Sequence, residues 1–369
     1  MSEGDLEWLE GGENRRARWQ SESAAPPKKI VLADDGTRAD AAFRLAAEGT
    51  ALIYEGDYQN ARQLLAAITH RVKPPKQTGE LAHDFHLYRQ ARGRCAQIAG
   101  RLLVPVNADL SIPLRRAPDL REALSEAWGA FDGPRVAPLR EVLGAVGAHE
   151  WRKKGVPVPA LNGRVHPHYG AFAPIRGEYV GLVANAPLGG AREAWDVGTG
   201  TGVLALVLAQ RGVPRVVATD IDPRVLDCAR ENVKRFGLQA QIDVREADLW
   251  PEGKAELIVC NPPWLPGRPT SRLERAIYDP DSSFLTRFIA ELPAHLTPGG
   301  EGWLVLSDLA ERLGLRPPGW LEQSFERAGL RVLGVSRTAA AHPRARDASD
   351  VFHAARAAEQ TALYRLGRA

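Results

Sequence analysis

Asp196-Val-Gly-Thr-Gly-Thr-Gly202 is a glycine-rich run that leads into the aliphatic run Val203-Leu-Ala-Leu-Val-Leu-Ala209. The pattern is typical of a strand at residues 193–197 followed by a helix at residues 202–211. A glycine-rich turn between a strand and a helix lets the backbone approach a ligand that side chains would exclude. A dinucleotide-binding turn would need glycine or alanine at Val203, so the pattern argues against NAD. The candidate ligand-binding residues in this run are Asp196, Gly198, Thr199, Gly200 and Gly202.

Acidic residues stand at the ends of the next two predicted strands. Asp220 ends the strand at residues 215–219, and its carboxylate can accept hydrogen bonds from both hydroxyls of a ribose. Asp222-Pro223 then opens a helix, with aspartate as the N-cap and proline at the first helical position. Asp248 follows the third strand and can accept a bond from the exocyclic amine of an adenine, with Leu249 or Trp250 beside its ring. Each acid alone fits an ordinary cap or loop, but their order predicts a nucleotide site. The candidates here are Asp220, Ile221, Asp248 and Leu249.

Asn261-Pro-Pro-Trp264 follows directly on a predicted strand at residues 256–260, where open α/β sheets place their chemistry. It suits a nitrogen whose lone pair is delocalised, as in a carboxamide or an adenine amine. The Asn261 oxygen and the Pro262 carbonyl can accept both N–H bonds and stabilise the charge that grows on the nitrogen. The prolines stiffen the loop, and the ring of Trp264 offers a flat contact face. The candidate catalytic residues are Asn261, Pro262, Pro263 and Trp264, and Asn261 is also a candidate for cofactor binding. A proline-rich turn with a packing tryptophan is the structural alternative.

Strands and helices are predicted to alternate from residue 190 onward. This order indicates a parallel sheet with helices on both faces. Strands are expected at residues 193–197, 215–219, 240–246, 256–260, 302–307 and 330–336, with a further one near 350–354. Helices are expected at residues 202–211, 223–236, 282–296 and 318–328. Residues 354–366 have the pattern of a helix or of a strand-to-helix tail.

The first 160 residues have a different composition. Residues 1–29 are rich in Glu, Gly, Ser, Arg and Pro, and they are expected to form a disordered leader. Residues 30–160 are expected to form a mainly helical substrate-recognition domain, and residues 161–369 the nucleotide-binding domain. Basic residues are frequent before residue 120, where a solvated helix face or a phosphate-binding stripe would explain them. His83 and His86 fit surface side chains better than metal ligands, so no metal site is predicted.

The composition is that of a globular enzyme of 369 residues with a formal charge of +3. Such a mild positive charge permits a nucleic-acid partner but does not require one. Cys95, Cys228 and Cys260 are far apart and form no CxxC pair, which argues against a disulfide framework or a zinc knuckle. No apolar run is long enough to span a bilayer, and the first residues lack the pattern of a signal peptide. We expect a cytoplasmic enzyme with no membrane partner.

The motifs Asp196–Gly202, Ala218-Thr-Asp-Ile-Asp222 and Ala247-Asp248 resemble those of the class I S-adenosylmethionine-dependent methyltransferases. The resemblance covers roughly residues 165–340. It implies an α/β, Rossmann-like sheet of seven strands whose last strand is antiparallel. It also implies S-adenosyl-L-methionine as the cofactor, with its methionine part along the glycine-rich run.

Asn261-Pro-Pro-Trp264 is similar to the NPP(Y/F/W) signature of amino-methyltransferases. Ala173-Pro-Ile-Arg-Gly-Glu-Tyr-Val-Gly-Leu-Val183 resembles the segment before the cofactor domain in glutamine N5-methyltransferases that act on release factors and ribosomal protein. Tryptophan here replaces the commoner tyrosine, and the N-terminal part is longer than in that family. Residues 165–179, a segment punctuated by proline and glycine, are expected to be a lid or an interdomain connection, with Phe172, Arg176 and Glu178 as its substrate-side candidates.

The function that the sequence favours is methylation of a planar NH2 group on a macromolecule by S-adenosylmethionine. A glutamine side chain of a translation-related protein is the favoured substrate. The alternative is an exocyclic amine, adenine N6 or guanine N2, in RNA or DNA, which the arginine-rich terminal parts favour. A more distant alternative is a cofactor-binding module without catalysis.

Overall fold

The computed structural model describes residues 4–341 and 343–369. The chain divides into two compact units, Met1–Glu150 and Trp151–Ala369. The boundary lies ten residues before the one predicted, because the hairpin of β7 (Val156–Val158) and β8 (Gly163–Val165) belongs to the second unit. Val158, Leu161 and Val165 are buried in the core of that unit. None of the helices among the described residues is both long and apolar enough to cross a membrane.

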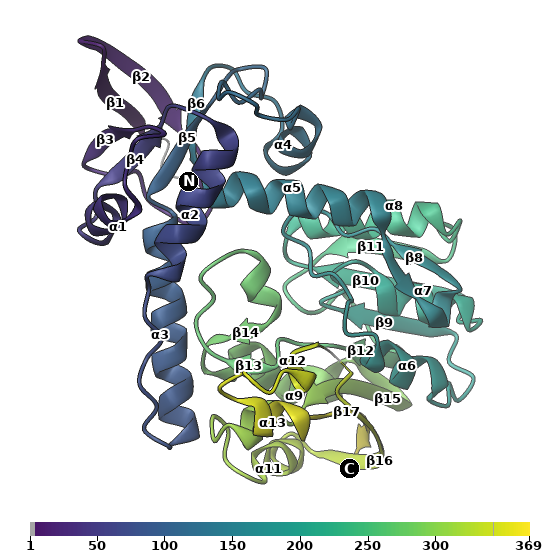
Figure 1. Cartoon of the computed structure of the whole chain (residues 1–369). Coiled ribbons are helices and arrows are strands. Elements are labelled where there is room, and N and C mark those ends of the chain that lie inside the picture. Colours follow the sequence, from purple (N-terminus) through teal and green to yellow (C-terminus); the bar gives the residue numbers. More distant parts are fainter. Residues whose placement is uncertain (1–3, 342) are drawn as a thin grey trace. The chain divides into compact units, whose positions relative to one another are not determined.

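The second unit is built on a seven-stranded sheet in the order β11-β10-β9-β12-β15-β17-β16 (Figure 1). Neighbouring strands are parallel except for β17, which is antiparallel to both β15 and β16. The predicted Rossmann-like sheet with an antiparallel last strand is therefore confirmed. The strands are β9 (Glu193–Val197), β10 (Arg215–Asp220), β11 (Ile242–Glu246), β12 (Ala255–Cys260), β15 (Leu296–Ser307), β16 (Leu330–Ala339) and β17 (Gln360–Arg368).

Helices cover both faces of this sheet, because successive strand residues point to opposite sides. Ala194 packs with α7 and α6 on one face, while Trp195 packs with α9 and α11 on the other. Every residue from Val203 to Ala209 is buried, which explains the unbroken aliphatic run of α7. The helices are α6 (Glu178–Asn185), α7 (Val203–Gln210), α8 (Pro223–Arg235), α9 (Ser283–His295), α10 (Leu309–Arg312), α11 (Trp320–Arg327), α12 (Pro343–Arg346) and α13 (His353–Ala357).

The C-terminal segment differs from the prediction. Residues 350–354 do not form a strand, and the predicted tail at residues 354–366 is mostly the strand β17. This strand lies between β15 and β16 and is buried on both faces, with Thr361, Leu363 and Leu366 fully enclosed. A strand that is buried on both faces does not alternate between apolar and polar residues. Its pattern therefore cannot be distinguished from that of a buried helix.

The first unit is a mixed α/β unit and not the mainly helical domain that the sequence predicted. Its six strands follow the order β1-β2-β6-β5-β4-β3, in which β3, β4 and β5 are parallel. The strands are β1 (Asp5–Glu10), β2 (Glu13–Trp19), β3 (Ile30–Ala33), β4 (Ala51–Tyr54), β5 (Leu102–Val106) and β6 (Arg135–Pro138). The helices are α1 (Ala39–Ala47), α2 (Tyr58–His70), α3 (Leu81–Ala99), α4 (Arg121–Trp128) and α5 (Leu139–Lys154).

Residues 5–19 of the expected disordered leader form an ordered hairpin. β1 and β2 pair antiparallel around Gly11 and Gly12, both with positive φ, as a two-residue hairpin turn requires. Leu6 and Trp19 are buried in the core of the small sheet, and Trp19 pairs with β6. Charged side chains occupy most other positions of the hairpin, so its composition imitates that of a disordered segment.

Candidate active site

A cavity of about 480 Å³ opens at the carboxyl ends of β9, β10 and β12. Its walls bring together most of the residues that the sequence singled out, from five separate segments of the second unit. The predicted residues that line it are Phe172, Asp196, Gly198, Thr199, Gly200, Asp220, Ile221, Asp248, Leu249, Asn261, Pro262 and Pro263. This grouping follows from the parallel sheet, because the carboxyl ends of its strands meet at one edge.

Four predicted residues do not line the cavity: Gly202, Trp264, Arg176 and Glu178. Gly202 has a φ of 82°, and a Cβ atom there would lie 3.5 Å from the Cα of Ala229 on α8. That distance is an ordinary contact, so the positive φ is what favours glycine at this position. The other three lie behind Asn261, and their contacts are described below.

Hydrogen bonds to Asp196 fix the conformation of the glycine-rich run. Its side chain is buried, and one carboxylate oxygen accepts hydrogen bonds from Thr199 Oγ1 at 2.6 Å and from the backbone N–H of Ala205 at 2.9 Å. Burial raises the pKa of Asp196 to about 6, although these two hydrogen bonds act in the opposite direction. The negative charge of the nearby Asp220 also raises the pKa of Asp196.

Asp220 connects the ends of β9 and β10. Its carboxylate accepts hydrogen bonds from the backbone N–H groups of Gly200, at 3.2 Å, and Asp222, at 3.1 Å. Burial raises its pKa as well. Among the described residues, no arginine or lysine forms an ion pair with Asp196 or Asp220. Asp196 is buried and Asp220 is partly buried, and two such carboxylates without a cationic partner favour a ligand that brings hydroxyl donors and positive charge.

The glycines of the run leave room for such a ligand. Gly198 and Gly200 have φ values of 71° and 57°, in the left-handed region that glycine adopts without strain. A Cβ atom at Gly200 would have no neighbour within 4 Å, so it would project into open space. The ribose and the cationic methionine part of S-adenosylmethionine therefore fit the residues present.

Asp248 and Leu249 follow β11 at one edge of the sheet. Asn261 follows β12, which is separated from β11 by β10 and β9. Asp248 is exposed and forms an ion pair with Arg287 at 3.1 Å. Leu249 is buried with a φ of 72°, unusual for a residue with a side chain, and its carbonyl accepts a hydrogen bond from Thr219 Oγ1 at 2.9 Å. Trp250 stacks on Phe288 outside the cavity walls. Leu249 therefore lines the cavity and Trp250 does not.

Asn261, Pro262 and Pro263 form the wall next to β12. Trp264 donates a hydrogen bond from Nε1 to Asn261 Oδ1 at 2.8 Å. An amide oxygen has two lone pairs, so Oδ1 can accept a second bond. The Pro262 carbonyl accepts no hydrogen bond from any residue that the structure describes. The Asn261 side-chain oxygen and the Pro262 carbonyl oxygen are therefore the candidate acceptors for an amine at this wall.

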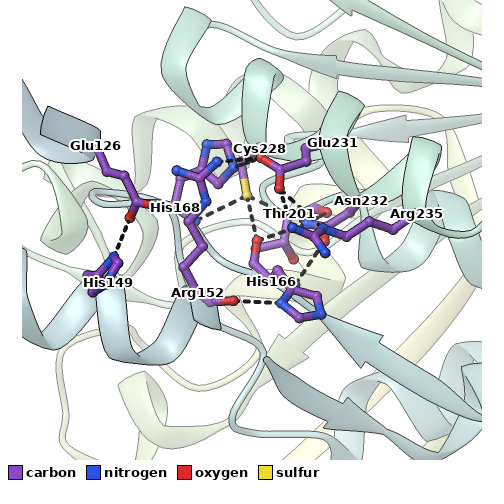
Figure 2. A network of polar contacts seen from close by, with 10 residues as sticks. All are labelled: Glu126, His149, Arg152, His166, His168, Thr201, Cys228, Glu231, Asn232 and Arg235. Atoms are coloured by element: carbon purple, nitrogen blue, oxygen red, sulfur yellow. Dashed lines mark hydrogen bonds and ion pairs between the residues drawn. The ribbon is translucent and has the colours of Figure 1, made fainter. Parts of the chain in front are cut away.

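The segment before Phe172 is fastened to α8 by the polar network in Figure 2. The amide of Asn232, which is fully buried, accepts a hydrogen bond from His166 N at 2.8 Å and donates one to the carbonyl of Thr201 at 3.1 Å. Glu231 accepts bonds from His168 Nε2 at 2.7 Å and from Arg152 at 2.6 Å. Partial burial would raise the pKa of Glu231, but its hydrogen bonds lower it to about 2. Asn232 thus connects this segment to the cavity-lining run through Thr201.

Ten residues of the segment 265–287 also line the cavity, and none of them was predicted from the sequence. The segment contains β13 (Leu265–Pro266), η2 (Leu273–Ala276), β14 (Tyr278–Asp279) and η3 (Pro280–Ser282). Asp279 is buried and accepts hydrogen bonds from the backbone N–H groups of Phe284 and Leu285 at the start of α9. Arg272 pairs with the N-cap Asp222 at 3.0 Å, and the exposed Arg275 stands at the cavity wall. Asp279, just before the helix predicted at residues 282–296, was the one local sequence signal that pointed to this segment.

In the part of the chain that the structure describes, no three His, Cys, Asp or Glu side chains cluster in a way that could hold a metal ion.

The comparison with protein families identifies this part of the chain. Residues 182–330 match the family model of the methyltransferase small domain. Over this part, less than half of its length, the chain is similar to a methyltransferase small domain. Its cofactor is S-adenosylmethionine, and the resemblance to class I methyltransferases that the motifs suggested is thereby confirmed.

Proteins related to this chain carry several names. A protein of Methanocaldococcus jannaschii named as a protein N5-glutamine methyltransferase is 31% identical over 126 residues, which are 32% of this chain and 63% of the relative. A ribosomal protein L11 methyltransferase of Sorangium cellulosum is 32% identical, over 50% of this chain and 60% of the relative. A release factor glutamine methyltransferase of Deinococcus radiodurans is 37% identical, over 28% of this chain and 42% of the relative. The chain thus spans less than two thirds of the length of each of these relatives.

The buried Asp196 predicts a pH-dependent stability in the absence of cofactor. Because its pKa is raised from 3.8 to about 6, the folded state binds more protons than the unfolded state between these values, and the free energy of unfolding falls as pH rises through this window. A shift of this size corresponds to about 3 kcal/mol, fully expressed above pH 6. Asp196→Asn has no carboxyl group to titrate at this position. The free energy of unfolding of the variant, relative to that of the wild type, should therefore rise between pH 4 and pH 7. Urea unfolding of both proteins at each pH measures this difference.

The exposed Asp243 on β11 provides a matched control, because Asp243→Asn leaves a solvated site. If the free energies of unfolding of Asp196→Asn and the wild type differed by the same amount at pH 4 and pH 7, the raised pKa of Asp196 would be contradicted.

Proposed function

We propose that this chain is an S-adenosylmethionine-dependent N-methyltransferase that acts on a planar NH2 group of a macromolecule, with a protein glutamine side chain as the favoured substrate. The observation that carries the proposal is the juxtaposition of two parts of one cavity. Asp196, Asp220 and the glycine-rich run form one part of its wall, and Asn261 and Pro262 form another. A cofactor and an amine would meet between them.

Different residues of the cavity would bind the cofactor and the substrate amine. Asp220 would accept hydrogen bonds from the ribose hydroxyls, and Leu249 would contact the adenine. The bound cofactor supplies a methyl group on a positively charged sulfur. Asn261 Oδ1 and the Pro262 carbonyl would accept both N–H bonds of the substrate, draw its nitrogen toward a tetrahedral form and stabilise the charge that develops there. The proton would then leave to water, so no histidine base is required.

The preference for glutamine rests on the motifs and on the relatives. The segment at residues 173–183 resembles the one that precedes the cofactor domain in glutamine N5-methyltransferases. Two of the relatives above are named as glutamine methyltransferases, and the third is named for ribosomal protein L11. The substrate-recognition role of residues 30–160 is part of the same proposal.

A base amine in RNA or DNA is a second candidate, and a specific feature of the first unit favours it. Residues 71–101 carry seven arginine or lysine side chains and two acidic ones, in a chain whose net charge is only +3. Lys73, Lys76, Arg92 and Arg94 in this segment are exposed. Such a concentration of positive charge suits a phosphate backbone.

One labelling experiment distinguishes the two candidates. The protein is incubated with methyl-labelled S-adenosylmethionine and an extract of cells that lack it. A glutamine substrate predicts label that protease releases and RNase does not, and that appears as methylamine after acid hydrolysis of the amide. Label released by nuclease would overturn the glutamine assignment in favour of a base. No transfer to any macromolecule would overturn the proposed function.

A further inference from the structure

Arg176 lies between two buried carboxylates and does not face the cavity. Its Nε donates to Glu178 at 2.9 Å and its Nη2 donates to Glu359 at 2.8 Å. The side chains of Glu178 and Glu359 are 5% and 0% exposed, and that of Arg176 is 21% exposed. Glu359 also accepts a hydrogen bond from Ser307 Oγ at the end of β15. Buried charges are costly unless they are paired, so this arrangement holds the guanidinium in one place.

The guanidinium lies over the ring of Trp264, with its central carbon 4.7 Å from the ring centroid. A planar guanidinium stacks on an aromatic face and is attracted to it by the charge distribution of the ring. Because Arg176 is fixed by two carboxylates, the contact restricts the orientation of the indole. The substrate-side role that the sequence suggested for Arg176 and Glu178 is therefore not the one that their contacts favour.

Trp264 in turn determines the orientation of the Asn261 amide. The indole nitrogen is a donor only, so the Asn261 atom 2.8 Å away must be the oxygen. This assignment is independent of the usual ambiguity between amide oxygen and nitrogen. A tyrosine or phenylalanine ring carries no such N–H group. A rotated amide would present an NH2 group to the substrate amine, and two donors would then face each other.

We propose that Arg176 and Trp264 form a clamp that keeps the oxygen of Asn261 aligned as an acceptor. Arg176 is then a positioning residue, which acts through Trp264, and Glu359 is the buried counter-ion that fixes Arg176. The clamp joins three distant segments: the one before α6, the loop after β12 and the turn before β17. Its effect on turnover rests on the proposed function, whereas the clamp itself is a property of the free protein.

Indole proton exchange tests the clamp without any substrate. The chain has nine tryptophans, so ¹⁵N-labelled indoles give nine side-chain signals, and Trp264→Phe identifies the one from residue 264. Arg176→Lys keeps the positive charge for Glu178 and Glu359 but loses the planar fork. We expect the Trp264 N–H of the full-length protein to exchange slowly with solvent, and to exchange about tenfold faster or more in Arg176→Lys and in Asn261→Ala, as loss of a positioned contact implies. The other eight signals should keep their exchange rates.

Two results would overturn the clamp. Rapid exchange of the Trp264 N–H in the wild type would mean that it has no hydrogen bond to Asn261. Unchanged exchange in Arg176→Lys would mean that Arg176 does not restrain the indole.

Turnover provides the second measurement, with the labelled macromolecule from the extract experiment as substrate. Arg176→Lys and Trp264→Phe should each lower kcat about tenfold, as slight misplacement of a reacting group does, with the KM for S-adenosylmethionine unchanged. The double variant should be no slower than the slower single variant, because both changes remove one coupled unit. Additive losses would contradict the clamp.

Arg365→Lys is the matched control. Arg365 is 25% exposed and makes two hydrogen bonds to Glu301, at 2.8 and 2.6 Å, within the same sheet but outside the cavity wall. It should lose comparable stability while kcat stays at the wild-type value. If no macromolecule accepts label, the proposed function fails, and the exchange of the Trp264 N–H still decides on the clamp.

Discussion

Replacing Asn261 by alanine is expected to lower the turnover number for methyl transfer by roughly 10²–10³-fold, the usual effect of removing one oriented group that stabilises developing charge. The side-chain oxygen at the cavity wall would be lost, and one of the two N–H bonds of the substrate would have no acceptor. Affinity for S-adenosylmethionine should stay near the wild-type value. Single-turnover labelling measures the chemical step, and calorimetry measures cofactor binding.

Asn261→Asp tests whether an acceptor oxygen at this position is enough to support turnover. Aspartate keeps an oxygen within reach of Trp264 Nε1 and provides a second acceptor toward the cavity, so it should retain more activity than alanine. Equal losses of turnover and cofactor affinity in Asn261→Ala would show that this residue supports the loop structurally and does not hold the amine.

Replacing Asp220 by alanine should weaken the binding of S-adenosylmethionine by about 10- to 100-fold, since hydrogen bonds to a charged group contribute roughly 1.5–3 kcal/mol. The carboxylate would be lost from the end of β10, where two ribose hydroxyls are expected to donate. Asp220 also accepts the backbone N–H of Gly200, so the alanine variant would loosen the glycine-rich run as well. Isothermal calorimetry at pH 7.5 measures the dissociation constant.

Asp220→Asn distinguishes these two causes, because an amide keeps one acceptor for Gly200 but loses one of the two ribose contacts. An intermediate affinity is expected. Asp243→Ala on the neighbouring strand serves as the control and should bind like the wild type. Wild-type affinity in Asp220→Ala would remove the ribose assignment.

The sheet of the second unit could be predicted because its elements have strong local signals. Asp222 and Pro223 mark the start of α8, and the strand predicted at 256–260 ends at Cys260, directly before Asn261, as expected. The acids at successive strand ends indicated the cavity because parallel strands bring their carboxyl ends to one edge. Leu249 could be placed for the same reason, although its left-handed backbone has no signal in the sequence.

Other parts were determined by contacts that no local pattern reveals. Arg176 was expected to face a substrate, but its partner Glu359 comes from a turn 183 residues further along the chain. The strands of the first unit are short, and Pro105 in β5 and Pro138 in β6 conceal their pattern. Tertiary pairing, and not propensity, makes these segments strands.

The position of β17 between β15 and β16 has a consequence for synthesis of the chain. All sheet pairing of β16 is with β17, which is translated about twenty residues later. Until residue 368 has left the ribosome, β16 has no neighbour and β15 exposes an open edge, the kind of surface that recruits chaperones or other nascent chains. The same nine residues follow directly on Glu359, so the strand that completes the sheet and the counter-ion of Arg176 become available to the folding chain together.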